Sequence, residues 1–186
     1  MLSVWDIPIL LQMNNIQAKI YCFDASIFIT LNRINNFISI PDIWDELEQM
    51  FISDRLISHR YVYEEFNPER KKPDFIAKWI KDKKQYFYDI TPRQIQLTRN
   101  ILQKFPDLID YKREKNQADP WLIALAIEKN EEIPLFGKNK KYYVVSGEKD
   151  LSNKKIPATC REFNVPHMSF KEFMQDNGWR IGLIKE

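Results

Sequence analysis

Four carboxylates in this 186-residue chain stand where apolar segments begin or end. They are Asp24, Glu65, Asp119 and Glu148. Carboxylates that gather at one place repel one another and raise their own pKa values unless a cation neutralises them. Hard oxygen ligands favour Mg²⁺ or Mn²⁺, and such an ion can activate water for phosphodiester hydrolysis. The four acids therefore predict a divalent-metal site, provided that the fold brings them together.

The segment around Asp119 is the most informative of these positions. We expect Asp119 to be the N-cap of a helix and Pro120 to take the first helical position, where its missing N–H is not needed. Residues 121–126 carry almost no polar atom, so the helix should be buried. An ordinary role explains each acid taken alone, such as a cap, a strand-end turn or a surface charge. The metal site becomes the better explanation when the four are considered jointly.

Short apolar strands alternate with amphipathic helices along the chain, which predicts an α/β fold with a mostly parallel central sheet. Strands are expected at 19–23, 55–58, 86–88, 141–145 and 165–168, and helices at 26–37, 41–51, 62–66, 73–85, 92–105, 119–129, 156–160 and 169–174. In such folds ligands bind beyond the carboxyl ends of the strands, where the helices also start. The topology is therefore able to bring all four acids to one rim.

Composition indicates one globular domain, which we place at residues 19–175, with an N-terminal extension at 1–18 and a C-terminal tail at 176–186. No stretch approaches the roughly 20 apolar residues of a membrane span. The first residues lack the basic region and cleavage site of a signal peptide, so we expect a cytoplasmic protein with no membrane contact. The two cysteines and two histidines do not have the spacing of a zinc site.

Lysine and arginine occur in short runs although the net charge is only +2. Such runs are usually solvated faces. A polyanionic substrate nevertheless needs positive charge near the reaction centre. The first candidates for contacts with RNA phosphates are Arg113, Lys138, Lys140 and Lys141.

Several segments together resemble a known family. They are Phe23-Asp24-Ala25-Ser26, Val62-Tyr63-Glu64-Glu65-Phe66, Ala118-Asp119-Pro120-Trp121-Leu122-Ile123-Ala124, Val144-Val145-Ser146-Gly147-Glu148 and Ile156-Pro157 with Cys160. In this order they resemble PIN-domain ribonucleases, and more narrowly the PIN-like group of bacterial proteins called DUF4411. The resemblance implies a PIN-like three-layer α/β/α sandwich. It also implies an endoribonuclease that depends on Mg²⁺ or Mn²⁺, often the toxin of a toxin–antitoxin pair.

By motif position, the resemblance assigns metal binding to Asp24, Glu65 and Asp119, with Glu64 as an alternative to Glu65. Ser26 would help to hold the first aspartate or a metal-bound water.

The fourth acidic place falls to Glu148. The family commonly has Thr-x-Asp there, whereas this chain has Ser146-Gly147-Glu148. Ser146 keeps the hydroxyl, but glutamate is longer than aspartate. Asp150 is therefore a possible substitute.

Two other classes of function compete with the nuclease. The altered fourth motif is compatible with a PIN-like module that has lost cleavage and binds RNA or protein. Phosphotransfer receivers and haloacid-type phosphatases also use an Asp after the first strand, but they need an acidic pair or Asp-x-Asp where this chain has Asp24-Ala25-Ser26. A cognate antitoxin or a homodimer contact would use the apolar N-terminal extension and the C-terminal tail, which alternatively just cover the core.

Overall fold

The structure is a computed structural model that describes residues 17–37, 43–112, 117–132, 139–148 and 155–180. Within these ranges the core is a sheet of five strands in the order β3-β2-β1-β4-β5, and every neighbouring pair is parallel. The strands are β1 (Ala18–Phe23), β2 (Leu56–His59), β3 (Phe87–Tyr88), β4 (Lys140–Ser146) and β5 (His167–Ser169). The predicted α/β fold with a parallel central sheet is confirmed.

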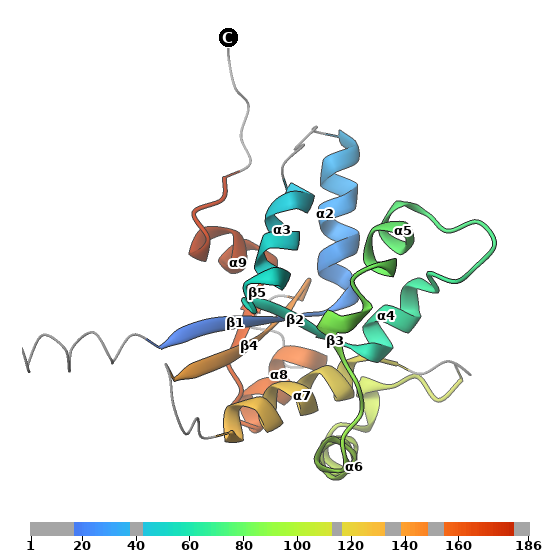
Figure 1. Cartoon of the computed structure of the whole chain (residues 1–186). Helices are drawn as coiled ribbons and strands as arrows, with labels where there is room; N and C mark the ends of the chain where they lie inside the picture. Colours follow the sequence, from blue (N-terminus) through green and yellow to red (C-terminus); the bar gives the residue numbers. More distant parts are fainter. Residues whose placement is uncertain (1–16, 38–42, 113–116, 133–138, 149–154, 181–186) are drawn as a thin grey trace, which may run out of the picture.

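Helices cover both faces of the sheet and make a three-layer α/β/α sandwich (Figure 1). One layer consists of α2 (Ala25–Phe37), α3 (Ile43–Ile52), α4 (Arg60–Phe66), α5 (Phe75–Lys81) and α9 (Phe170–Asp176). The other consists of α6 (Pro92–Lys104), α7 (Asp119–Glu131) and α8 (Lys155–Glu162). Two short 3-10 turns, η1 (Lys84–Tyr86) and η2 (Pro106–Leu108), complete the described elements.

The two layers have different cores. The core under α2 and α3 is rich in aromatic rings, with Phe23, Phe28 and Phe51 fully buried. The core on the other face is mostly aliphatic and is built around α7, whose residues Leu122–Ala126 are completely buried. This confirms the prediction of a buried helix after Asp119, and it fixes the start of α7 against the sheet.

The strand order reverses direction at β1, since the chain goes from β1 to β2 on one side and reaches β4 on the other. In parallel sheets, ligands bind in the crevice at such a switch point. Phe23 at the end of β1 lies in register with Val145 of β4. The next backbone N–H, from Asp24, donates to the Val145 carbonyl at 3.0 Å. Asp24 therefore sits at the carboxyl edge, between the two halves of the sheet.

Some element boundaries differ from the prediction. The helix expected at 73–85 is shorter at both ends. It begins after Asp74, whose side chain caps α5 by accepting a hydrogen bond from the Ala77 N–H, and it ends at Lys81, ahead of the 3-10 turn η1. The last strand begins at His167 rather than at residue 165.

The prediction that Asp119 is an N-cap is wrong. Ala118 is the N-cap of α7, and its carbonyl accepts from the N–H groups of Trp121 and Leu122. The Ala118 N–H is held by Oε1 of Glu65 at 3.1 Å. Asp119 is therefore the first helical residue, and its carboxylate is not used for capping.

The end of the described chain packs on the core. Asp176 accepts a hydrogen bond from the Tyr21 hydroxyl at 2.5 Å. The ring of Trp179 meets Phe173 at a centroid distance of 5.3 Å. This part of the tail therefore covers the core, which is one of the two roles considered for it. No helix in the described ranges is long and apolar enough to cross a membrane.

Candidate active site

Asp24 is a buried carboxylate at the carboxyl end of β1. Only 7% of the residue is exposed. Its Oδ2 accepts hydrogen bonds from the backbone N–H and from the hydroxyl of Ser26. Burial raises the pKa of Asp24 above its usual range, although these hydrogen bonds favour the charged form. The backbone and the hydroxyl of Ser26 therefore hold Asp24 in a fixed orientation.

Asp24 and Asp119 line one cleft. Asp119 stands at the start of α7. Burial and then repulsion from Asp24, Glu65 and Glu148 raise the pKa of Asp119 to about 8. Among the described residues, no donor is hydrogen-bonded to its carboxylate. Asp24 and Asp119 therefore face one space and do not point to separate surfaces.

Glu65, not Glu64, belongs to this cleft. Glu65 lines it, and Glu64 lines a different cavity on the other side of α4. Oε1 of Glu64 instead accepts from the Arg60 guanidinium at 2.9 Å, a pair one helical turn apart. The structure therefore decides between two adjacent glutamates that the sequence left open.

Glu148 reaches the same group of acids from the turn after β4. Its Oε2 is buried and has no hydrogen-bond partner among the described residues. Burial raises the pKa of Glu148, while attraction to Lys155 and a hydrogen bond from the backbone of Ile156 lower it. Ser146 does not face the cleft; its hydroxyl bonds the His167 ring at 2.9 Å and accepts from the Glu148 N–H. Ser146 thus supports the turn that carries Glu148.

The cleft itself has a volume of about 500 Å³. Three charged residues that sequence reasoning missed line it together with Asp24, Glu65 and Asp119, namely Asp107, Asp110 and Lys155. The two aspartates belong to a polar loop segment without a motif, so no sequence signal singled them out. Lys155 was visible only as part of a basic run, and it adopts a left-handed backbone with φ 60° at the start of α8.

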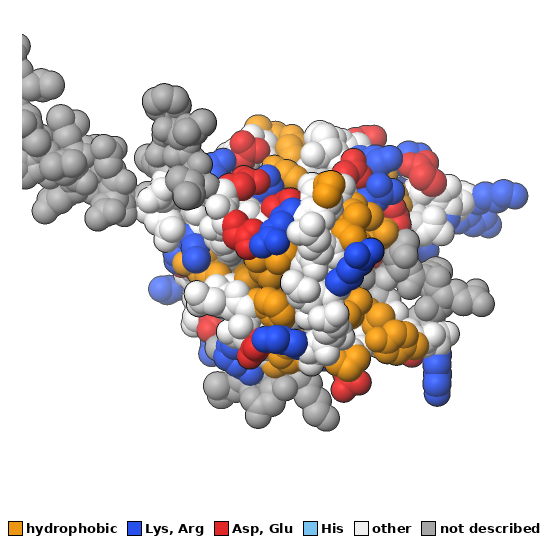
Figure 2. All heavy atoms as spheres, turned by 90° about the horizontal axis from the view of Figure 1, so that it is seen from below, with side chains coloured by type: hydrophobic (Ala, Val, Ile, Leu, Met, Phe, Trp, Pro, Cys, Tyr) orange, Lys and Arg blue, Asp and Glu red, His pale blue; other side chains and the backbone are white. Residues whose placement is uncertain are grey.

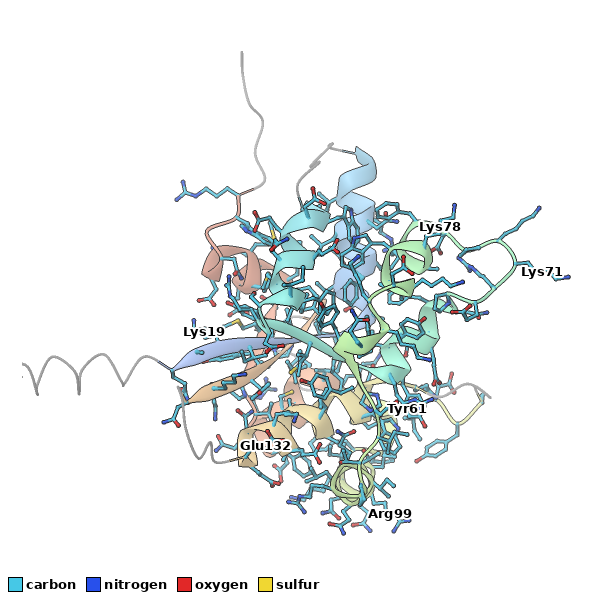
Figure 3. The ribbon with its side chains drawn as sticks, viewed as in Figure 1. Lys19, Tyr61, Lys71, Lys78, Arg99 and Glu132 are labelled. Carbon is cyan, nitrogen blue, oxygen red and sulfur yellow. The ribbon has the colours of Figure 1, made fainter. Side chains whose placement is uncertain are left out.

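Lys140 and Lys141 do not lie near the acids. They pair in register with Ala18 and Lys19 at the amino edge of the sheet, roughly 20 Å of strand away from the carboxyl edge. Figure 3 shows Lys19 at this end, far from Tyr61 of α4. The prediction that these two lysines stand at the rim of the site is therefore wrong, because β4 is long enough to separate its two ends. Arg113, Lys138 and Asp150 lie outside the described residues.

The face seen from below, over α6, is not a basic surface either. Lysine and arginine side chains there are interspersed with acidic and hydrophobic ones (Figure 2). Arg93 pairs with Glu131 at 2.7 Å and Lys104 with Glu162 at 2.5 Å. These two cations are therefore paired with acids of neighbouring helices.

The donor set suits a hard divalent cation. As they stand, no three His, Cys, Asp or Glu side chains of the described residues lie close enough together to hold one ion. The chemistry of the site nevertheless fits such an ion. The buried Oε2 of Glu148 has no hydrogen-bond partner among the described residues, and Asp119 is repelled by Asp24, Glu65 and Glu148. Carboxylate oxygens are the ligands that Mg²⁺ and Mn²⁺ prefer. Asp24, Asp119, Glu65 and Glu148 are the residues that would hold it.

Comparison with protein families gives one match, to the family described as "Domain of unknown function (DUF4411)", over residues 21–181. The match includes every element from β1 to α9 except the first three residues of β1. No curated protein matches the chain.

Proposed function

We propose that this chain, which belongs to the DUF4411 family, is a Mg²⁺- or Mn²⁺-dependent endoribonuclease of the PIN type. The proposal covers the reaction class, hydrolysis of an RNA phosphodiester bond, and its location in the cleft at the carboxyl edge of the sheet. A second inference rests on the sequence resemblance alone: that the enzyme is a toxin silenced by a protein antitoxin. The cytoplasmic location rests instead on the first residues, which lack the pattern of a signal peptide, and a homodimer contact is one of the two roles considered for the N-terminal extension and the C-terminal tail.

The observation that carries the proposal is the position of the Asp119 carboxylate among other acids. Asp119 lines the same cleft as Asp24 and Glu65, and no donor of the described residues is hydrogen-bonded to its carboxylate. Burial and then repulsion from Asp24, Glu65 and Glu148 raise its pKa to about 8. Repulsion of this kind is costly in a metal-free protein and is relieved by a divalent cation. Clusters of perturbed acids in a cleft are typical of catalytic sites.

Each residue then has a distinct task. Asp24 and Asp119, with Glu65, would bind the ion, which when present supplies an acidified water and a Lewis acid for the phosphate. Ser26 orients Asp24 through two hydrogen bonds. Lys155 supplies positive charge for a phosphate oxygen of the substrate, where negative charge grows during hydrolysis.

We expect Asp119→Asn to lower the rate of RNA cleavage at least about a hundredfold, because the amide cannot replace an anionic ligand. The folded protein should persist, since removing an acid with a raised pKa removes repulsion and leaves stability at pH 8 equal or greater. The measurement is the cleavage rate of a labelled RNA with Mn²⁺, together with a thermal melt.

The matched control is Glu131→Gln, which changes an exposed acid at the other end of α7 that pairs with Arg93. It should cut RNA at the wild-type rate. Cleavage by purified Asp119→Asn at that same rate would remove the nuclease assignment.

Two observations favour a second candidate, a PIN-like module that binds RNA or protein without cutting it. The acids of the described residues do not yet converge on one point, and a glutamate occupies the fourth acidic place. Calorimetric titration with Mn²⁺ separates the two functions, because a degenerate site would bind no ion.

A further inference from the structure

A second cavity, of about 650 Å³, lies on the opposite side of α4 from Glu65. It is lined by Arg60, Tyr63, Glu64, Lys84, Tyr88 and Asp89. Its volume is within the range of small-ligand sites, roughly 300–1,000 Å³. Neither the metal nor the hydrolysis of the proposed function uses these residues.

We propose that this cavity binds one unpaired nucleotide of an RNA strand whose cleaved phosphate lies in the acidic cleft. The inference rests on the proposed function and specifies its substrate as single-stranded RNA. Its support comes from the cations, the rings and the position of the cavity.

Two cationic side chains, Arg60 and Lys84, line the cavity, and they differ in their partners. The Arg60 guanidinium is held by Glu64 and by Asp89, the latter at 3.0 Å, through three of its five N–H donors. Two donors remain, on a group whose orientation is already fixed, which favours recognition of phosphate or of a base edge. Lys84 has no acidic partner among the described residues; its ammonium lies 5.9 Å from the centre of the Tyr63 ring.

Aromatic surface accompanies these charges. Tyr88 is 37% exposed and is one of the large apolar side chains that the described structure leaves exposed, together with Ile52, Phe75, Ile95 and Tyr111. The Lys129 ammonium lies 5.1 Å over its ring and helps to hold it in place. Unpaired bases stack on exposed aromatic rings beside basic groups, and this combination is how proteins bind single-stranded nucleic acid.

The position of the cavity connects it to the cleft. Arg60 and Glu65 stand at opposite ends of one short helix, only about 7.5 Å apart along its axis. Tyr61 stands four residues before Glu65 on α4, so the two share a helical face. Its half-exposed ring packs edge-on against Trp121, two residues after Asp119, at 5.3 Å. A strand that crosses α4 over Tyr61 therefore reaches both sites.

A duplex does not satisfy this geometry, because a base has to leave its stack to enter a cavity. The predicted substrate is consequently an unpaired segment, with one nucleotide anchored beyond α4.

The test measures binding of a fluorescent single-stranded RNA by anisotropy in EDTA, where no metal-dependent cleavage occurs. Tyr88→Ala and Lys84→Gln should each weaken binding by about fivefold or more, and the same sequence in a duplex should bind weakly to every variant. Both residues are exposed, so the variants should fold, which a thermal melt checks. The control is Lys71→Gln, an exposed lysine that does not line the cavity and that projects away from the body of the molecule (Figure 3).

Wild-type binding by both cavity variants would overturn the proposal, as would equal affinity for the duplex. These results are separate from the fate of the proposed function. If Mn²⁺ supports no cleavage but the cavity variants still lose RNA, the nuclease assignment fails and the nucleotide site stands.

Discussion

Lys155 places a single positive charge among the carboxylates of the acidic cleft. It lowers the pKa values of Asp119 and Glu148 against the effect of burial. Its φ of 60° is a conformation that residues other than glycine rarely adopt. Strained backbone of this kind is often kept where a side chain has a functional position. We infer that Lys155 is directed toward the substrate and is not an ordinary surface lysine.

This assignment predicts opposite effects of one substitution on two properties. Lys155→Gln should tighten Mn²⁺ binding by about fivefold, since it removes a cation that competes for the same acids. The variant should also cleave RNA more slowly, since the phosphate loses its partner. Calorimetry and single-turnover kinetics measure the two properties. A variant with weaker metal binding would instead indicate that Lys155 only supports the fold.

The turn after β4 controls Asp24 indirectly, at the scale of elements. The Gly147 N–H donates to the Ser26 hydroxyl at 2.8 Å, and that hydroxyl donates to Asp24. A Cβ at Gly147 would lie 3.1 Å from the Ser26 oxygen. The loop and the start of α2 are therefore packed so tightly that only glycine leaves Ser26 in place.

We expect Gly147→Ala to weaken Mn²⁺ binding and slow cleavage by about tenfold, an effect of about 1.4 kcal/mol on the position of Asp24. The melting temperature should change little, because Gly147 is exposed. Ser26→Ala should reproduce the loss. Normal metal affinity in both variants would show that Asp24 needs no orientation.

The elements themselves were largely predictable, because apolar spacing and caps such as Thr91 are local signals. The arrangement of the site was less predictable from the sequence. The choice between Glu64 and Glu65 depends on how far α4 is rotated. The positions of Lys140 and Lys155 depend on which edge of the sheet each one occupies. Asp119 as a cap was wrong, because Glu65, 53 residues away in sequence, takes over the Ala118 N–H.

At the scale of the whole molecule, His59 joins the two layers. It ends β2, and its Nδ1 accepts from the Tyr61 N–H to cap α4. Its ring also stacks on Trp121 of α7 at 5.8 Å. Burial lowers the pKa of His59 to about 4, with Arg60 acting in the same direction and Gln94 and Asp89 against it. The folded protein therefore keeps this histidine neutral.

The sign of the resulting pH dependence follows from proton uptake. Below about pH 6.5 the unfolded chain protonates His59 and the folded protein does not, so stability falls as the pH drops from 6.5 toward 4. His59→Asn keeps an oxygen for the cap but does not titrate. As the pH falls through this window, the unfolding free energy of His59→Asn should decrease less than that of the wild type. The difference should be up to about 1.4 kcal/mol per pH unit. Equal slopes in denaturant melts would contradict the neutral, buried histidine.

The account depends on acids from β1, α4 and α7 sharing one ion at the carboxyl edge of the sheet. A crystal structure of the wild-type protein soaked in Mn²⁺ tests this most directly, through the anomalous signal of the metal. We predict a peak between Asp24 and Asp119, with an oxygen of each bound to the ion and Glu65 drawn toward it. A protein saturated with Mn²⁺ that shows no peak in this cleft, or one bound only elsewhere, would contradict the account.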